Sequence, residues 1–381
     1  MSFLVFDGHT DVPTRLLEAP ADLSRPAPGG HVDLPRLRRG GVGGLVFALW
    51  VPPHLEPEAG LEHALLLHRL TVEQLRPGGL EAVATAAALE QAKGRDAVGV
   101  VLGLENGRPL SLPGALDRLH GLGVRIVTLT HTASHEWCDA AGDDEPHGGL
   151  APQGEEMVRE LNRRGIVVDV SHVSDRAVEH VLEVSEAPVV ASHSSARALC
   201  DHPRNLTDAL ALSVARRGGV VMANAYPAFL DDTARLANQR RMEHLGAAMR
   251  SLQDAHADDP LAFARARQGM LAGHPQPPVP RQRYVDHILH LVEVCGEEGV
   301  GVGSDFDGIP ETPVGFEDVA RYPGLVAALR QRGLDGRALE LVLWGNFARV
   351  WRAVERAAAT GDRALSTRRH RPAGSDRTSR R

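Results

Sequence analysis

The chain contains eight short apolar runs, rich in valine, in which hydrophobic and polar residues do not alternate. They cover residues 3–6, 44–50, 97–104, 124–129, 166–170, 187–191, 219–223 and 299–303. Runs of this length and composition are typical of strands that are buried on both faces of a parallel sheet. The pattern therefore predicts eight parallel strands.

Stretches with the apolar spacing of helices separate most of these runs, for example residues 61–75, 154–164 and 284–298. A strand followed by a helix, repeated eight times, predicts an α/β fold of the (β/α)8 TIM-barrel type. An open, doubly wound sheet is the alternative.

The segment from Phe229 to Arg283 does not fit the repeat, because it is too long for one crossover between the seventh and eighth runs. We expect a helical insertion with a loop over one face of the barrel, acting as a lid or a subunit contact. Residues 1–360 are expected to form a single domain, and the polar, Arg-rich residues 361–381 a disordered tail.

Composition narrows the class of protein. The 381 residues are 43% hydrophobic and 24% charged, which is typical of globular proteins. Residues 1–360 hold 35 basic against 47 acidic side chains, so nucleic acid is not expected as a partner. No run of 18 apolar residues and no basic segment before an apolar stretch is present, which predicts no membrane contact and a cytoplasmic location.

Known sequence signatures of other site types are missing from the sequence. The three cysteines have no CxxC spacing, so a disulfide framework or a thiolate zinc site is not expected. No glycine-rich phosphate motif follows a predicted strand, and no GxSxG motif of serine hydrolases is present.

Histidines and carboxylates follow the apolar runs instead. In a parallel barrel all strand C-termini open at one mouth, so these side chains should converge there. They are His9, Asp11, Glu105, His131, His172, His193 and Asp305. Imidazoles and carboxylates without thiolates favour zinc or a similar divalent metal.

Spacing suggests how the ligands divide. His9 and Asp11 are two residues apart, so at an extended strand end both can bind one ion. Burying the charge of Glu105 at a strand end would be costly unless the carboxylate is paired or metal-bound. Its two oxygens can bridge two ions. The alternative is that Glu105 caps the N-terminus of the next helix. His172 and His193 follow two successive runs at matching places, which favours a metal site. One such histidine alone would more often be an ordinary buried residue. Five ligand groups are more than one tetrahedral zinc with an open position can bind, so the set predicts two ions.

Three more residues suit catalysis or substrate binding. Asp305 could take a proton from metal-bound water and pass it to a leaving amine, or be a turn residue. His131 could donate a hydrogen bond to an oxyanion, or be a plain buried histidine. Arg204 follows the sixth run and could pair with a substrate carboxylate, or form a surface salt bridge.

From Asp7 to about Val354 the chain resembles the membrane (renal) dipeptidase family of the amidohydrolase superfamily. The matching motifs include Asp7-Gly8-His9-Thr10-Asp11, Asp169-Val170-Ser171-His172, Ala191-Ser192-His193-Ser194, Arg204-Asn205 and Gly303-Ser304-Asp305-Phe306-Asp307-Gly308. The chain departs from relatives at His135, Asn106 and Trp344, which leaves side-chain specificity open.

The resemblance implies a role for each matched residue. It implies that His9 and Asp11 bind one zinc, that His172 and His193 bind the other, and that Glu105 bridges them. His131, Arg204 and Asn205 would bind substrate, and Asp305 would transfer the proton. Two zinc ions per subunit and a homodimer are likewise implied.

The predicted function is a zinc-dependent dipeptidase, in which a metal-bridging hydroxide attacks the peptide bond of short peptides, including those with a D-residue at the C-terminal position. One alternative is an amidohydrolase that acts on another small amide, such as an N-acyl amino acid. The other is a non-catalytic metal-binding barrel, which would show broken ligand positions; none is broken.

Overall fold

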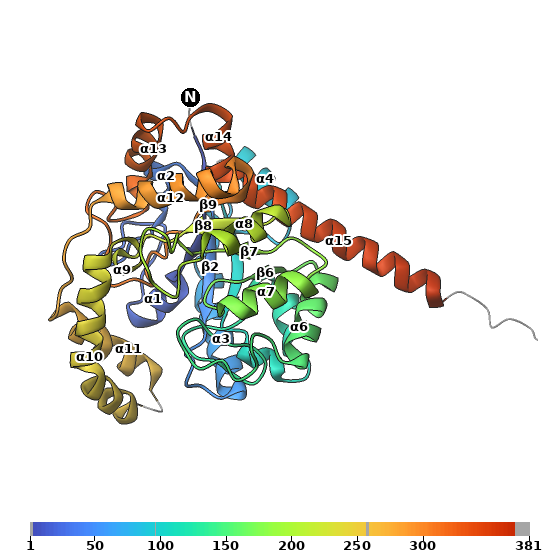
Figure 1. The fold of residues 1–381 in the computed structure, drawn as a ribbon, viewed down its shortest axis with the longest axis horizontal. Coiled ribbons are helices and arrows are strands. Elements are labelled where there is room, and N and C mark those ends of the chain that lie inside the picture. Colours follow the sequence, from blue (N-terminus) through green and yellow to red (C-terminus); the bar gives the residue numbers. More distant parts are fainter. Residues whose placement is uncertain (1–2, 96, 257–258, 370–381) are drawn as a thin grey trace, which may run out of the picture.

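The computed structural model describes residues 3–95, 97–256 and 259–369 (Figure 1). Eight parallel strands form a closed barrel: β1 (Val5–Thr10), β2 (Val42–Trp50), β4 (Val98–Glu105), β5 (Val124–Thr128), β6 (Val167–Asp169), β7 (Val190–Ala191), β8 (Val220–Ala223) and β9 (Val300–Val302). The ring closes because β1 pairs with both β2 and β9, and β2 pairs directly with β4. The predicted TIM barrel is confirmed.

A ninth strand, β3 (Leu80–Ala82), was not predicted. It pairs with residues 98–100 of β4. Strand β5 pairs with residues 102–105 of β4, nearer its carboxyl end. Three residues, of which only Leu80 is buried, are too few to produce a readable apolar run.

Helices surround the barrel (Figure 1). They are α1 (Val12–Glu18), α2 (Leu34–Gly40), α3 (Pro57–Val72), α4 (Ala86–Gly94), α5 (Ala115–Gly121), α6 (Pro152–Arg163), α7 (Asp175–Val184), α8 (Asp208–Arg216), α9 (Pro227–Leu230), α10 (Asp232–Ala255), α11 (Pro260–Ala272), α12 (Arg281–Cys295), α13 (Tyr322–Gln331), α14 (Gly336–Glu340) and α15 (Asn346–Arg369). Hydroxyl caps start several of them. The side chain of Ser174, for example, accepts from the N–H of Ala177 at the start of α7.

The barrel interior is apolar at one end and polar at the other. Phe6 and Trp351 belong to one buried cluster with inward-facing strand residues, and the Phe6 ring stacks on Phe347 of α15 at 3.9 Å between centroids. At the carboxyl ends of the strands, Glu105 and Asp169 are buried instead. The buried polar residues of the barrel therefore lie at the mouth, where the predicted site is.

The predicted insertion from Phe229 to Arg283 is helical: it holds the end of α9, all of α10 and α11, and the first residues of α12. Nε of Arg265 on α11 donates to the Glu18 carbonyl at 2.8 Å, and the Phe263 ring faces His54 at 6.1 Å. Glu18 ends the helix after β1, and His54 lies just after β2, so the insertion packs on the mouth side. Its role as a lid or subunit contact stays a prediction.

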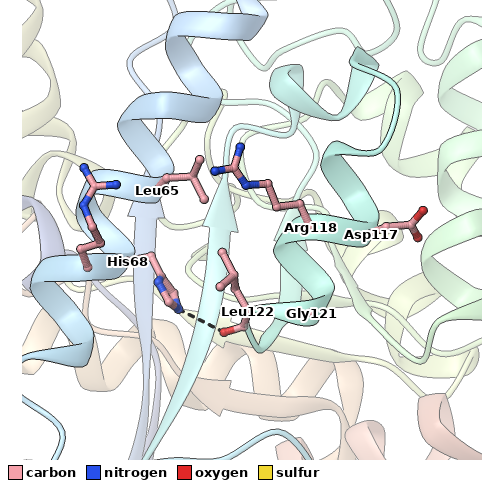
Figure 2. A pocket seen from close by; sticks show the side chains of 7 residues that line it. Leu65, His68, Asp117, Arg118, Gly121 and Leu122 are labelled. Atoms are coloured by element: carbon pink, nitrogen blue, oxygen red, sulfur yellow. Dashed lines mark hydrogen bonds between the residues drawn. The ribbon is translucent and has the colours of Figure 1, made fainter.

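A surface hollow of about 360 Å³ lies between α3 and α5 (Figure 2). The ring of His68 donates from Nε2 to the Leu122 carbonyl at 3.1 Å. Because Leu122 lies two residues before β5 begins, this hollow is at the end of the barrel opposite the mouth. None of the predicted site residues lines it.

The last helix changes the predicted tail. Helix α15 continues to Arg369 and extends beyond the barrel (Figure 1), so the segment predicted as disordered from residue 361 begins as helix. Arg363, Ala364 and Leu365 all favour helix, which the reading of the tail as polar overlooked. Residues 370–381 of the predicted tail lie outside the described residues. Among the described helices, none has both the length and the hydropathy to cross a bilayer.

Candidate active site

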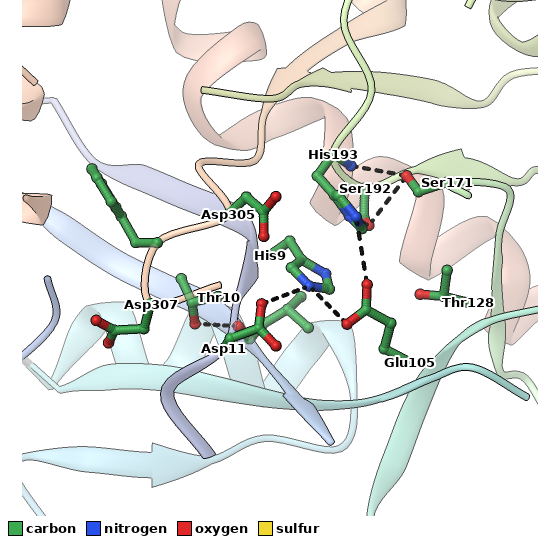
Figure 3. A network of polar contacts seen from close by, with 12 residues as sticks. His9, Thr10, Asp11, Glu105, Thr128, Ser171, Ser192, His193, Asp305 and Asp307 are labelled. Carbon is green, nitrogen blue, oxygen red and sulfur yellow. Dashed lines mark hydrogen bonds and ion pairs between the residues drawn. The ribbon is translucent and has the colours of Figure 1, made fainter. Parts of the chain in front are cut away.

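The strand ends bring the predicted residues together at the mouth. Glu105 is the last residue of β4, His9 lies in β1, and Asp11 directly follows β1. His172 and His193 follow β6 and β7 by three and two residues. Figure 3 shows the Glu105 carboxylate between the rings of His9 and His193.

The two oxygens of Glu105 face two different groups. Its Oε2 lies 3.5 Å from Nε2 of His9, and that nitrogen is 3.4 Å from Oδ2 of Asp11. Its Oε1 lies 3.2 Å from Nε2 of His172 and 3.5 Å from Nε2 of His193. One carboxylate therefore contacts both halves of the predicted ligand set, which is the arrangement a bridging ligand requires.

These atoms fit divalent cations. Ligands about 2 Å from a tetrahedral ion lie roughly 3.3 Å apart, close to the separations around Glu105. Nε2 of His9 and Nε2 of His193 are buried without a hydrogen-bond partner in the described part of the chain. Three overlapping groups place their ligand atoms within 4.8 Å of one another: His9, Glu105 and His193; Glu105, His131 and His172; and His9, Asp11 and Asp305.

Charge at the mouth also favours cations. Burial raises the pKa of Asp11, and the Glu105 carboxylate raises it further. Burial raises the pKa of Asp305 to about 7, with Asp11 and Glu105 adding to the effect and His9 opposing it. The buried carboxylates of Asp11 and Glu105 and the half-buried one of Asp305 repel one another at this distance, and a bound cation would remove that cost. Burial lowers the pKa of His172 well below its usual value, which keeps the ring neutral as a metal ligand must be.

The backbone is strained at the strand ends. The four non-glycine residues with positive φ in the described chain are Asn106 (73°), His172 (72°), Asp305 (64°) and Asp307 (68°). Such residues cluster at functional sites, where the surrounding structure holds them in place. Asn106 is among the residues that tolerate this region, and its amide also donates to the Val51 carbonyl at 3.0 Å, which accounts for an asparagine after Glu105.

Asp305 is held by a residue that the sequence analysis missed. Nδ2 of Asn224 donates to Oδ2 of Asp305 at 3.0 Å, and Oδ1 of Asn224 accepts from the Tyr226 N–H at 2.6 Å. Asn224 directly follows β8, so the rule that polar residues at strand ends reach the mouth would have found it.

Glycine is required beside Asp305. A Cβ on Gly308 would lie 2.2 Å from Oδ2 of Asp11 and 2.7 Å from Oδ1 of Asp305. Asp307 pairs with His31 instead, accepting from its N–H at 2.6 Å while its own N–H donates to Nδ1 of His31 at 2.9 Å.

Arg204 is a buried cation with spare donors. Its guanidinium makes two long contacts, to Oγ of Ser194 at 3.4 Å and to the His193 carbonyl at 3.3 Å, and its Nε has no partner in the described structure. Burial lowers its pKa to about 10, while Asp305 and nearby carboxylates oppose the effect. A guanidinium that stays charged here needs an anion, and a ligand carboxylate would supply it.

His131 and Asn205 differ in their access to the mouth. The His131 ring stacks on His172 at 4.1 Å between centroids, and burial, with a smaller effect from Arg204, lowers its pKa to about 3. His131 is therefore neutral and remains able to donate a hydrogen bond. Asn205 is fully buried, and its Nδ2 donates to the carbonyls of Cys200 and Phe229. Because both amide protons are used, Asn205 can offer a ligand only its Oδ1, which has no partner in the described part of the chain. Its role in substrate binding stays a prediction.

Comparison with known proteins matches residues 1–364 to the family model described as membrane dipeptidase (peptidase family M19). An uncharacterized dipeptidase of Schizosaccharomyces pombe is 31% identical over 374 residues, covering 93% of this chain and 81% of that protein. Dipeptidase tcpJ of Claviceps purpurea is 33% identical over 347 residues, covering 87% and 71%.

Solved structures agree in fold. The probable dipeptidase PvdM of Pseudomonas aeruginosa superposes with a TM-score of 0.80 at 26% identity, covering 93% of this chain and 96% of that one. A Rhodobacter sphaeroides metallopeptidase liganded with a phosphinate mimic of L-Ala-D-Ala gives 0.75 at 26% identity, covering 93% and 100%. The chain thus belongs to the membrane dipeptidase family of metallopeptidases, whose substrates are small peptides.

Proposed function

We propose that this protein hydrolyses dipeptides at a pair of divalent ions, with zinc as the expected metal, and that it accepts a D-residue at the C-terminal position. The observation that carries the proposal is the position of Glu105, with one oxygen toward His9 and the other toward His172 and His193. In this proposal His9 and Asp11 would hold one ion, His172 and His193 would hold the other, and Glu105 would contribute one oxygen to each.

The ions, when bound, would lower the pKa of a water molecule toward neutrality and polarise the peptide carbonyl. Asp305 accepts the proton of the attacking water and returns it to the leaving amine. The hydrogen bond from Asn224 orients its carboxylate, and a pKa raised toward neutral by burial suits an exchange in both directions. The neutral His131 donates a hydrogen bond to the developing oxyanion.

Arg204 selects the length of the substrate. Its guanidinium contacts the His193 carbonyl, so a C-terminal carboxylate bound there lies next to the proposed metal ligands. A carboxylate held this close to the metal ligands would place the scissile bond near the C-terminal residue, which would favour dipeptides over longer chains. Support for a D-residue comes from the phosphinate mimic of L-Ala-D-Ala bound to the Rhodobacter sphaeroides relative.

The test is hydrolysis by zinc-reconstituted protein of L-Ala-L-Ala, L-Ala-D-Ala and the C-terminal amide of L-Ala-L-Ala. We expect both dipeptides to be cleaved and the amide to be a poor substrate. Arg204→Met should lower kcat/KM for dipeptides by about 10² to 10³, because a buried charge pair is lost, and should barely change the amide. Absence of dipeptide hydrolysis by protein that holds its metal would refute the proposal.

N-acetyl-alanine, in both stereochemical series, separates the alternative reaction from the proposed one. An N-acyl amino acid presents the same carboxylate to Arg204, so only the relative rates distinguish it from a dipeptide. Bound metal without hydrolysis of any of these compounds would instead support a non-catalytic barrel. Homodimeric assembly and a cytoplasmic location stay predictions, to be tested by light scattering and cell fractionation.

A further inference from the structure

Asp169 is a buried carboxylate that the proposed mechanism does not use. It ends β6, is fully buried, and accepts four hydrogen bonds. The donors are Oγ1 of Thr128 at 2.6 Å, Oγ of Ser192 at 2.6 Å, the Ser192 N–H at 2.9 Å and the Ser171 N–H at 2.9 Å. All four partners are donors, so the carboxylate acts here only as an acceptor.

Ser192 connects this carboxylate to His193. Its Oγ lies 2.6 Å from Oδ2 of Asp169 and 2.7 Å from Nδ1 of His193. The hydroxyl has one proton, and the Asp169 carboxylate accepts from all of its partners, so the proton of Ser192 is donated to Asp169. Nδ1 of His193 must then carry a proton and donate it to Oγ of Ser192.

The tautomer of His193 follows from this chain of donors. With Nδ1 protonated, the neutral ring has its lone pair on Nε2, the nitrogen that lies 3.5 Å from Glu105 and has no hydrogen-bond partner in the described chain. Figure 3 shows Ser192 and Ser171 beside His193, with Ser171 also accepting from the His193 N–H. His172 differs, because its Nδ1 is buried without a partner among the described residues.

We propose that Ser192 and Asp169 are positioning residues that hold His193 in the Nδ1–H tautomer and strengthen Nε2 as a ligand for a divalent cation. The inference rests on the proposed metal pair. It adds that the two histidines proposed to share one ion are held differently: His193 is supported by a hydroxyl and a carboxylate, and His172 by neither. Hydrogen-bond partners behind a metal-bound histidine typically change metal affinity by about 10- to 100-fold.

The experiment measures zinc affinity by chelator competition in the full chain. Ser192→Ala should weaken one of the two zinc sites by about 10- to 100-fold and leave the other unchanged, and Ser192→Thr, which keeps the hydroxyl, should restore it. The matched control is Ser185→Ala, which removes another buried hydroxyl, bonded to Asn162 and to the Ala187 carbonyl. In cadmium-loaded protein, Ser192→Ala should shift one of two cadmium NMR signals, and Ser185→Ala neither.

The outcomes separate the inference from the proposed function. Wild-type protein that binds no pair of ions contradicts the proposed function itself. Wild-type protein that binds two ions and cleaves dipeptides, while Ser192→Ala binds both ions as tightly, overturns only the inference. If Ser192→Ala does not fold, nitrogen NMR of labelled histidines in the wild-type apoprotein decides, with the signal assigned by its loss in His193→Gln. A His193 ring protonated at Nε2 would overturn the inference.

Discussion

The strand ends of the barrel and the insertion between β8 and β9 both contribute to the mouth, but they are organised differently. At the strand ends, each polar residue is placed by its own strand, as Glu105 is by β4. In the insertion, position depends on contacts between distant residues, such as Arg241 and Glu311, which are 70 residues apart. The chemistry is therefore carried by short local segments on a rigid frame, and the insertion supports them through long-range contacts.

The insertion reaches the proposed acid through one continuous network. Arg241 is buried on α10 and donates to Glu311 at 2.6 Å and to Oδ1 of Asn238 at 2.9 Å. It also donates to the Tyr226 hydroxyl at 3.3 Å, and the Tyr226 N–H donates to Asn224, which holds Asp305. If the comparison is right, changes at strand ends alter catalysis first, and changes in the insertion alter stability first.

The largest effect is expected at the strand end of β9. Asp305→Asn should lower kcat by about 10² to 10⁴, the usual contribution of a general acid/base, while zinc content stays at the wild-type level. Steady-state kinetics and metal analysis measure both. Asn224→Ala should cost less, about tenfold in kcat, because it removes one hydrogen bond to the carboxylate. Normal turnover by Asp305→Asn would remove this residue from the mechanism.

The insertion should respond in stability. Arg241→Met leaves the Glu311 carboxylate without its partner and should lower the free energy of unfolding by about 3 kcal/mol, the low end for breaking a buried pair. Urea denaturation measures it. Arg235→Met is the matched control on the same helix, since Arg235 bonds only to the exposed Asp232 within one turn, and it should cost at most about 1 kcal/mol. Equal stability of the two variants would show that the network does not anchor the insertion.

The same contrast explains what could be predicted from sequence. The eight barrel strands were located to within four residues at each end, and the polar residues after them converge, because strand period is a local property. The supports were missed. Asn224 directly follows β8 and was within reach of the strand-end rule, whereas the Asp169–Ser192 hydrogen bond and the Arg241–Glu311 contact join segments whose pairing no local pattern encodes. The bonds of Asn205 to the Cys200 and Phe229 carbonyls depend on the direction of its side chain within the loop, which the sequence does not show, and its role in substrate binding stays a prediction.

His287 gives a smaller effect that links the two regions. On α12 its Nδ1 accepts from the Ala196 N–H at 3.1 Å, in the loop that carries His193, and its Nε2–H donates to the Leu230 carbonyl at 3.1 Å, at the start of the insertion. The bond from Ala196 requires a lone pair on Nδ1 and therefore a neutral ring. Burial lowers the pKa of His287 to about 4; Arg283 and His290 lower it further, whereas the Leu230 carbonyl and Asp286 oppose the shift.

This pKa predicts how stability depends on pH. Above the unfolded value of about 6.5 the ring is neutral in both states, and the contribution is complete. As pH falls from 6.5 toward 4 the unfolded chain binds a proton that the folded chain does not, so folding loses about 2 kcal/mol by pH 5. His287→Gln should be less stable at pH 7 but should lose about 2 kcal/mol less than wild type between pH 6.5 and 5, as urea titrations would measure. Parallel losses in the two proteins would mean that His287 does not join the loop after β7 to the insertion as a neutral ring.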